Sequence, residues 1–340
     1  MTHVAAKFLN IYGLAIIYHG QCERLASQLL RPFSTFLTDS ASTITPSATI
    51  EIRYEKPPYE TFPQLVARFS TPRNVVYANE DTKVIDYFGQ GVVVELKHES
   101  RFTIYSTDNN FLQEAFYLMV LSLFGQHVDR IGMLRVHALS ICYRDTAFLL
   151  PIPSGGGKST MAISLLEEAD IKLISDDEPL VDNECNIHPF HTRIGTLDQN
   201  LIESIPEEFY YQIDRMEFGK KYFIDCAFWG DKLQKAPVNK CILFVSRRIL
   251  NGEPSIEPCN KIAALRTLVR DSVVGIGLYQ GIEFIFKSSP WELLAKSFIV
   301  LRRFRLAVKL VLKSRTYQIT LTQDIHRNTR VFSDFMRKIG

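Results

Sequence analysis

The chain has 340 residues, of which 46% are apolar and 22% are charged, as expected for a folded protein with one large or two ordinary domains. The formal net charge of +2 gives no indication of nucleic-acid binding, and no stretch reaches the roughly 18 unbroken apolar residues that a membrane-spanning helix needs. The six cysteines are scattered without C-x-x-C spacing, so the sequence predicts neither a zinc site nor a disulfide framework. Scattered thiols favour a reducing compartment, and we expect a cytoplasmic protein.

Residues 1–126 are expected to form a β-rich region. Short runs rich in Val, Ile, Tyr and Thr, separated by turn residues, predict strands over Phe8–Tyr18, Ala48–Tyr54, Asn74–Tyr77, Lys83–Phe88, Gly91–Leu96 and Arg101–Tyr105. The Ser- and Thr-rich stretch Ser34–Ser47 is expected to be a loop. A helix over Phe111–Gln126 closes the region, and its apolar residues surround most of the helix, which predicts burial on all sides.

Residues 127–340 alternate between strand and helix patterns. Strands are expected over Leu134–Tyr143, Ala147–Leu150, Ile171–Ser175, Glu178–Val181, Asn186–Phe190, Lys240–Ser246 and Tyr317–Thr322. Helices are expected over Lys158–Glu168, Pro258–Arg270, Pro290–Lys313 and Asn328–Lys338, the last capped by Asn328. Lys240–Ser246 is continuously apolar and should be a central strand. Mixed strands and helices in this order predict an α/β domain.

A glycine-rich turn follows the strand that ends at Leu150. The order strand, glycine turn and helix predicts a phosphate-binding loop, because glycines let backbone amides crowd around an anion at a helix N-terminus. Lys158 would reach the β- and γ-phosphates of a nucleotide, and the Ser159 hydroxyl would bind Mg²⁺. In the Walker A pattern G-x-x-x-x-G-K-[ST], Ile152 occupies the place of the first glycine. The candidate nucleotide-binding residues are Ser154, Gly155, Gly156, Gly157, Lys158, Ser159 and Thr160.

Two adjacent carboxylates, Asp176 and Asp177, end the strand that follows the predicted phosphate-loop helix. In phosphate-loop proteins such a carboxylate holds Mg²⁺, and a second one could accept the proton of an incoming hydroxyl. His137 lies 21 residues before Lys158 in a predicted strand, where it is either a core residue or part of the site. Arg193 follows a further strand and could stabilise transferred charge. His188 and His191 do not predict a metal site, because Pro189 breaks the helical spacing.

These residues together resemble the catalytic domain of HPr kinase/phosphorylase. His137, Ser154-Gly155-Gly156-Gly157-Lys158-Ser159 and Asp176-Asp177 have the order and near-spacing of that family, whose nucleotide core is also similar to that of phosphoenolpyruvate carboxykinase. The stretches Cys241–Arg248 and Ile256–Pro258 look more like HPr-kinase-related proteins of peptide-modification gene clusters, such as lasso-peptide serine kinases. The resemblance covers roughly residues 130–275.

The resemblance implies an α/β fold with a P-loop core and mixed sheet over 127–340, preceded by the β-rich part over 1–126. It implies an ATP- and Mg²⁺-dependent transferase that phosphorylates a Ser or Thr hydroxyl of a peptide or protein. Asp176 would be the base, His137 would tune it, and Asp177 would lie on the metal side, with the order of the two aspartates left open. The glycine-rich signature that follows the aspartates in HPr kinases is absent, so neither phosphorylase activity nor HPr as substrate is implied.

Two alternatives remain open at this stage. A small-molecule hydroxyl kinase would need the same residues, and a non-catalytic nucleotide-binding scaffold is favoured by Ile152. Near the end of the chain, basic residues predict one helix face that is either solvated or docks an acidic peptide or partner. These are Arg302, Arg303, Arg305, Lys309, Lys313 and Arg315. The sequence does not decide whether the chain forms a homo-oligomer.

Overall fold

The computed structural model describes residues 5–39, 45–153, 155–215, 219–275 and 290–339, with side chains for all of these except 274–275 and 290–296. The chain divides into two units. The first comprises Met1–Phe124 and Tyr211–Asp225, and the second comprises Gly125–Tyr210 and Cys226–Gly340. The expected boundary between residues 126 and 127 lies two residues beyond the first point of division. No pattern in the sequence predicts that Tyr211–Asp225 returns to the first unit.

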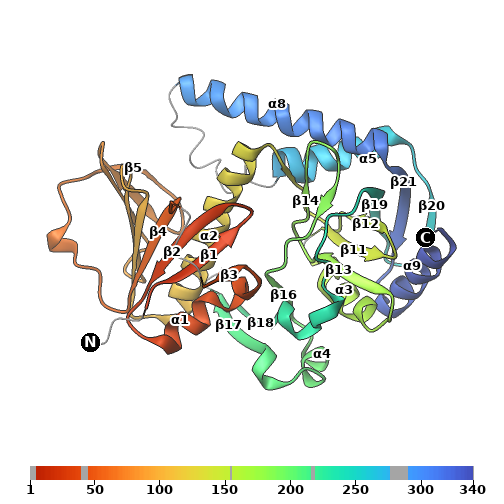
Figure 1. Cartoon of the computed structure of the whole chain (residues 1–340), viewed down its shortest axis with the longest axis horizontal. Coiled ribbons are helices and arrows are strands. Elements are labelled where there is room, and N and C mark those ends of the chain that lie inside the picture. Colours follow the sequence, from red (N-terminus) through yellow and green to blue (C-terminus); the bar gives the residue numbers. More distant parts are fainter. Residues whose placement is uncertain (1–4, 40–44, 154, 216–218, 276–289, 340) are drawn as a thin grey trace. The chain divides into compact units, whose positions relative to one another are not determined.

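The first unit is built on a nine-stranded mixed sheet with the order β3-β1-β2-β4-β9-β8-β7-β6-β5 (Figure 1). Its elements are β1 (Lys7–Ile11), β2 (Leu14–His19), α1 (Glu23–Leu30), β3 (Leu37–Thr38), β4 (Ala48–Arg53), β5 (Val66–Ser70), β6 (Val75–Ala78), β7 (Thr82–Asp86), β8 (Val92–Leu96) and β9 (Arg101–Tyr105). The later pair β17 (Tyr210–Arg215) and β18 (Gly219–Asp225) are hydrogen-bonded neighbours. This β-rich part agrees with the sequence prediction, although α1, β5, β17 and β18 were not expected. β3 lies in the stretch Ser34–Ser47 and pairs with β1, so the prediction of a loop is wrong at that point.

The predicted single strand Phe8–Tyr18 is wrong, because this stretch folds into the hairpin of β1 and β2. Tyr12 and Gly13 form its turn with φ values of +53° and +88°. Both values lie in the left-handed region, which a two-residue hairpin turn of this kind requires at both positions. The Asn10 side chain accepts a hydrogen bond of 3.0 Å from the Gly13 amide and fixes the turn.

The helix α2 (Asn109–Ile131) buries one stripe rather than its whole surface. The fully buried side chains of this stripe recur at four-residue spacing and are Leu112, Phe116, Val120, Phe124 and Val128. Phe116 packs edge-on against Tyr18 of β2 with ring centroids 5.6 Å apart. Leu118 on another face is 45% exposed, so the expectation of burial on all sides is wrong. Neither α2 nor any other helix within the described ranges is long and apolar enough to cross a membrane.

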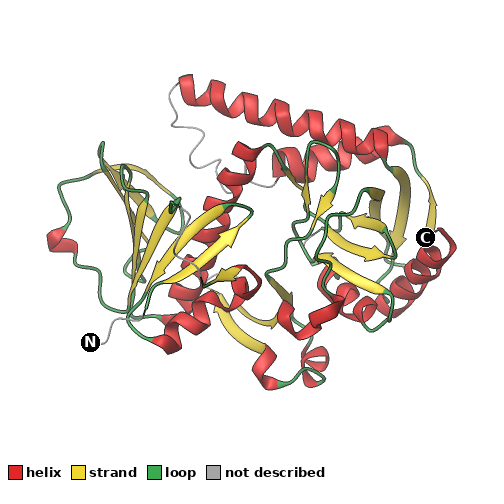
Figure 2. Cartoon of the chain, in the orientation of Figure 1, coloured by secondary structure: helices red, strands yellow, loops and turns green. Residues whose placement is uncertain are grey.

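The second unit contains a six-stranded mixed sheet with the order β13-β11-β12-β19-β21-β20, and a small sheet with the order β10-β14-β15 (Figure 2). Its strands are β10 (Leu134–Arg135), β11 (Leu139–Tyr143), β12 (Thr146–Leu150), β13 (Ile171–Ser175), β14 (Leu180–Val181), β15 (Ile187–His188), β16 (Arg193–Thr196), β19 (Lys240–Arg248), β20 (Ser255–Pro258) and β21 (Arg315–Leu321). Its helices are α3 (Lys158–Leu166), α4 (Gln199–Glu203), α5 (Lys261–Leu268), α8 (Pro290–Lys313) and α9 (Ile325–Ile339).

Helices cover both faces of the six-stranded sheet, because alternate side chains along each strand point to opposite faces. Leu149 of β12 and Leu243 of β19 belong to a buried cluster shared with α5 and α8. Their neighbours Phe148 and Phe244 face the other way and pack against Phe332 of α9, with ring centroids 6.0 and 5.4 Å apart. β19 lies between β12 and β21, which confirms the prediction of a central strand.

The directions of the strands bring their ends to one edge of this sheet. β12, β19 and β21 run parallel to one another. β11 is antiparallel to both β12 and β13, so β13 runs in the same direction as β12. The carboxyl ends of β12, β13, β19 and β21 therefore lie at the same edge, together with the first residue of β11.

The predicted strand Leu134–Tyr143 is interrupted, and His137 lies in the interruption. β10 ends at Arg135 and pairs with β14, whereas β11 begins at Leu139 and pairs with β12 and β13. The Val136 amide donates to the Pro179 carbonyl at 3.0 Å, and the Ala138 amide donates to the Asp177 carbonyl at 3.0 Å. The His137 amide donates to Ser272 Oγ at 3.2 Å. The chain changes sheets at this point, so the His137 backbone lies outside both strand ladders.

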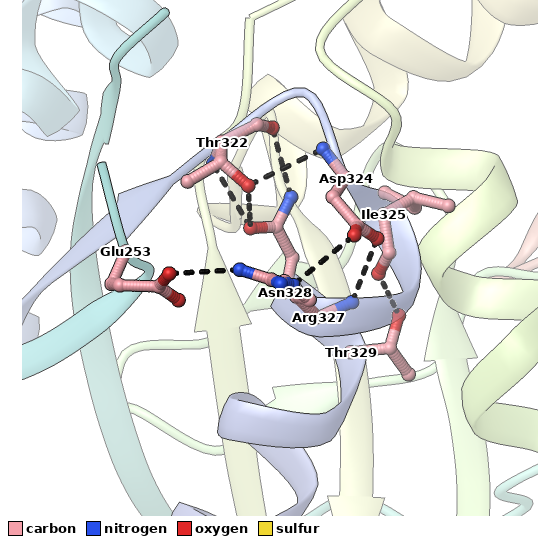
Figure 3. Close-up of polar contacts among 7 residues, drawn as sticks. All are labelled: Glu253, Thr322, Asp324, Ile325, Arg327, Asn328 and Thr329. Atoms are coloured by element: carbon pink, nitrogen blue, oxygen red, sulfur yellow. Dashed lines mark hydrogen bonds and ion pairs between the residues drawn. The ribbon is translucent and has the colours of Figure 1, made fainter. Parts of the chain in front are cut away.

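The start of α9 is fixed by a buried asparagine (Figure 3). Asp324 Oδ1 accepts from the Arg327 amide at 3.0 Å, so Asp324 is the residue that caps the helix. Asn328 lies inside the helix and is 2% exposed, so the predicted cap at Asn328 is wrong. Its Oδ1 accepts from the Thr322 amide at 2.9 Å, and its Nδ2 donates to the Thr322 carbonyl at 3.0 Å. Asn328 thereby ties the end of β21 to the first turns of α9.

Candidate functional site

The candidate site lies at the carboxyl edge of the six-stranded sheet. The glycine loop follows β12, the two aspartates follow β13, and Arg248 is the last residue of β19. His137 precedes β11, which begins at the same edge because it runs in the opposite direction. In open α/β sheets, ligands bind outside the carboxyl ends of the strands. Residues that are far apart in the sequence thus meet where such a sheet binds its ligand.

The glycine loop leads into the N-terminus of α3. Gly155 and Gly157 have φ values of +74° and +88°, which residues with a side chain rarely adopt. Gly157 is the N-cap residue, and among the described residues no side chain caps this terminus. The first intrahelical bond runs from the Met161 amide to the Gly157 carbonyl at 2.9 Å. The amides of the first turn therefore remain available for an anion, which the helix dipole also favours.

The loop accommodates Ile152 without strain. The φ of Ile152 lies outside the left-handed region, so this position does not require a glycine. Its side chain is 2% exposed and packs against Gly156, where a Cβ would lie 2.4 Å from Ile152 Cγ2. The predicted nucleotide-binding residue Ser154 lies outside the described residues. Thr160 is the third residue of α3, so its amide belongs to the first turn.

The Lys158 ammonium lies in a cluster with His137 and Asp177. Lys158 Nζ is 2.6 Å from Asp177 Oδ1 and 2.8 Å from His137 Nε2, and His137 Nδ1 is 3.2 Å from the same Asp177 oxygen. An ammonium can only donate, so Nε2 accepts from Lys158 and the proton of the neutral ring sits on Nδ1. Lys158 is 8% exposed, whereas the side chain of Asp177 is 54% exposed. The cluster buries its cation and leaves its carboxylate open to solvent.

Asp176 is paired with the first turn of α3. Ser159 Oγ donates to Asp176 Oδ2 at 3.0 Å. A hydroxyl beside a carboxylate provides oxygen donors of the kind that Mg²⁺ prefers. Among the described residues, no group of three or more His, Cys, Asp and Glu side chains is placed to hold a metal ion by itself. The two oxygens fit Mg²⁺ only together with phosphate and water ligands, which this ion commonly keeps.

The two aspartates have partners opposite to those that the resemblance implies. His137, the residue expected to tune the base, contacts Asp177. Ser159, the expected magnesium ligand, contacts Asp176. The geometry therefore favours Asp177 as the residue beside the histidine and Asp176 as the residue on the metal side.

The other predicted residues lie in the strands that follow. Arg193 is the first residue of β16, a strand that packs against α3, and its catalytic role stays a prediction. His191 is 8% exposed and donates through Nε2 to the Leu173 carbonyl at 2.9 Å, and burial lowers its pKa. His188 is the last residue of β15 and pairs at 2.8 Å with Asp182, which lies in the turn between β14 and β15. Both histidines thus have hydrogen-bond partners within the second unit.

Sequence reasoning missed two residues that contact the glycine loop. Arg248 Nη1 donates to the Gly155 carbonyl at 3.2 Å, although the two residues are 93 positions apart. Ile325 of α9 approaches Gly157 so closely that a Cβ there would lie 2.9 Å from Ile325 Cδ1. The arginine pair that ends the apolar strand of β19 was a usable signal for Arg248, because a charged residue at such a strand end is placed at the ligand edge. No local pattern indicates Ile325.

No protein-family model matches the chain, and no curated protein matches it. What this site can do therefore follows from the residues at the carboxyl edge alone.

Proposed function

We propose that the chain is an ATP-dependent phosphotransferase that moves the γ-phosphoryl group to a Ser or Thr hydroxyl of a peptide or protein. We propose further that its second unit is a P-loop core of the HPr kinase type. One observation carries this proposal, namely the meeting of a glycine loop, a buried lysine and two carboxylates at one sheet edge. Phosphoryl transfer needs positioning and charge stabilisation more than covalent chemistry, and this set of residues supplies both.

The loop and α3 would hold the phosphates of ATP. The amides of Lys158, Ser159 and Thr160 point away from the helix and have no intrahelical acceptor. Ser159 and Asp176 would hold Mg²⁺ through the Oγ and Oδ2 atoms that now lie 3.0 Å apart. When bound, Mg²⁺ neutralises charge on the phosphate oxygens.

Asp177 would accept the proton of the acceptor hydroxyl. Its carboxylate is the more exposed partner of its ion pair with Lys158 and can meet an incoming substrate. His137 would help to position this carboxylate, because its Nδ1 lies 3.2 Å from Asp177 Oδ1. As the hydroxyl oxygen bonds to phosphorus, its proton passes to Asp177 and ADP leaves. This assignment reverses the order of the two aspartates that the resemblance implies.

Lys158 would change partners when ATP binds. In the free protein its ammonium contacts Asp177 and His137. Phosphate oxygens would attract the same ammonium, since the amides of the α3 N-terminus gather them beside it. The exchange would leave Asp177 with His137 alone, ready to accept a proton. Arg248, which is exposed and donates to the Gly155 carbonyl, offers a second cation at the loop.

The test is transfer of label from γ-labelled ATP with Mg²⁺ to serine-containing peptides encoded by neighbouring genes. We expect label on a peptide serine with the wild-type chain and its loss with Lys158→Ala. The matched control is Lys240→Ala, because Lys240 is an exposed lysine that pairs with Asp145 at the other end of β19. Label found only on small alcohols would indicate a small-molecule kinase. Tight binding of ATP without transfer to any acceptor would indicate a scaffold and contradict the proposal.

A further inference from the structure

A pocket of about 560 Å³ lies in the second unit and is lined by residues from the end of α2 and from α8. Its volume falls within the range of about 300–1,000 Å³ that is usual for ligand pockets. Its walls carry the arginines Arg130, Arg302 and Arg305 together with the apolar side chains Phe298 and Leu301. No step of the proposed reaction uses these residues.

The acidic residue in the pocket wall does not neutralise these arginines. Asp129 forms a two-pronged ion pair with Arg303, with distances of 2.8 and 2.6 Å. Arg303 is 8% exposed and points away from the solvent face of α8. Among the described residues, no carboxylate pairs with Arg130, Arg302 or Arg305. The pocket therefore presents a net positive charge that its own walls leave uncompensated.

The basic helix face expected from the sequence is thus divided by the fold. Arg303 is buried with Asp129, while Lys309 and Lys313 donate to the backbone carbonyls of Asn183 and Glu184. Arg302 and Arg305 line the pocket, and Arg130 joins them from α2. The charge is consequently concentrated in a concave site instead of being spread along a solvated face.

Apolar side chains share this surface with the arginines. Phe298 is 70% exposed and Leu301 is 44% exposed, and both line the pocket. Large exposed apolar groups beside arginines are typical of binding surfaces. A partner with carboxylates around an apolar side chain would satisfy both features. A flat membrane surface would fit less well, because it cannot fill a concave pocket.

We propose that this pocket docks an acidic segment of the substrate peptide, with one apolar side chain inserted between α2 and α8. The proposal rests on the peptide-kinase function proposed above. The pocket belongs to the same unit as the catalytic cluster and is linked to it by hydrogen bonds. Arg303 donates to the Val273 carbonyl at 3.5 Å, and the neighbouring Ser272 accepts from the His137 amide at 3.2 Å. A segment held here would be retained while its serine reacts elsewhere on the unit.

The test measures binding without nucleotide. A fluorescein-labelled peptide with glutamates on both sides of a phenylalanine is titrated with the full chain, and anisotropy is recorded. We expect the double variant R302E/R305E to lower the affinity at least about tenfold. Phe298→Ser should lower it as well. Arg130→Glu, which changes the pocket from another helix, should repeat the effect if the double variant fails to fold. The matched control is Arg315→Glu, an exposed arginine at the start of β21 with the same change of charge.

Several outcomes would overturn the proposal. These are an affinity weaker than about 1 mM, equal loss with R315E, and equal binding of a peptide that lacks the phenylalanine. Equal binding of inorganic polyphosphate, or binding to phosphatidylserine vesicles but not to peptide, would do the same. The proposed function fails separately. If the chain binds the peptide at this pocket but transfers no phosphate, the proposed kinase function is contradicted and the docking site is supported. If the wild-type chain phosphorylates acidic peptides and R302E/R305E does so with an unchanged KM, the docking site is contradicted and the kinase function is supported.

Discussion

Ile152 and Gly156 are in direct contact across the glycine loop. A Cβ at Gly156 would lie 2.4 Å from Ile152 Cγ2 and 2.8 Å from the Pro153 carbonyl oxygen. The Gly156 amide also donates to that carbonyl at 2.9 Å, which closes the turn. The isoleucine that departs from the Walker A pattern thus fills the space beside a glycine, and the loop depends on both residues.

Gly156→Ala should disturb the loop more than Gly155→Ala does. At Gly156 the new methyl group would collide with backbone and with a buried side chain, and the backbone has to move. At Gly155 nothing lies within 4 Å of a Cβ, so the cost comes from its φ of +74° alone, about 1 kcal/mol. Calorimetry should show Mg-ATP affinity reduced by more than about tenfold for Gly156→Ala. Equal affinities of the two variants would contradict this account.

Ile152→Ala should lower stability without abolishing nucleotide binding. The side chain is 2% exposed, and truncation of a buried isoleucine costs about 2–5 kcal/mol. The amides that would contact phosphate begin after this residue, so Mg-ATP affinity should change less than about tenfold. Denaturant unfolding and calorimetry measure the two quantities on one preparation. A large gain in affinity would instead mean that Ile152 obstructs the loop.

The two aspartates should respond differently to neutralisation. Asp177→Asn removes the expected proton acceptor, so phosphoryl transfer should fall by about 10²–10⁴ while Mg-ATP still binds. Asp176→Asn leaves the amide as a poorer ligand beside Ser159, so the Mg²⁺ concentration needed for half-maximal rate should rise. His137→Ala should give a smaller loss and a changed pH profile. If Asp176→Asn loses transfer and Asp177→Asn only changes the Mg²⁺ requirement, the order implied by the resemblance is restored.

How much of the fold can be predicted from the sequence depends on whether the contacts that define each element are local. Arg101–Tyr105 and Ile171–Ser175 are predicted to the residue, because each is a short run between turns whose pattern depends on its own residues. The interruption at His137 could not be predicted, because its amide is held by Ser272, 135 positions away.

The residues of the candidate site can likewise be predicted from the sequence only where local patterns indicate them. The residues of the glycine loop and the aspartate pair are found from their types and order, because a phosphate site needs glycines, a lysine and carboxylates. Which aspartate meets His137 depends on how the chain turns after β13, and adjacent residues give no sign of it. Arg248 reaches the loop only through the pairing of β19 with β12.

Asn328→Ala should destabilise the second unit by about 3 kcal/mol, because the Thr322 amide and carbonyl would lose their partners in a buried place. Thr322 is 8% exposed, so water does not readily replace the lost bonds. Asp324→Ala should cost about 1 kcal/mol as a lost cap. Arg327→Ala removes an exposed ion pair with Glu253 and should cost at most about 1 kcal/mol. Denaturant unfolding should rank the three variants in this order, and an Asn328 variant as stable as Arg327→Ala would contradict the buried role.

His191 should make stability depend on pH. Burial lowers its folded-state pKa, whereas the unfolded chain binds the proton near pH 6.5. The contribution of neutral His191 is therefore fully present above about pH 6.5 and declines as the pH falls toward its folded-state pKa, by at most about 1.4 kcal/mol per pH unit. His191→Gln keeps a donor for the Leu173 carbonyl but does not titrate. Unfolding free energies measured at several pH values should vary less in this variant, while the exposed control His326→Gln should follow the wild type.

The return of Tyr211–Asp225 to the first unit has a consequence for when each unit can complete its fold during synthesis. Arg31 pairs with Asp225 and stacks on the Tyr211 ring at 4.7 Å, so one early residue holds both ends of the late segment. Domains usually fold as they leave the ribosome, the N-terminal one first. Here the earlier unit waits for residues made 194 positions after Arg31, by which time the strands and helix of the glycine loop have already emerged. The nascent chain must therefore carry two unfinished units at once, and neither can be released as a contiguous fragment.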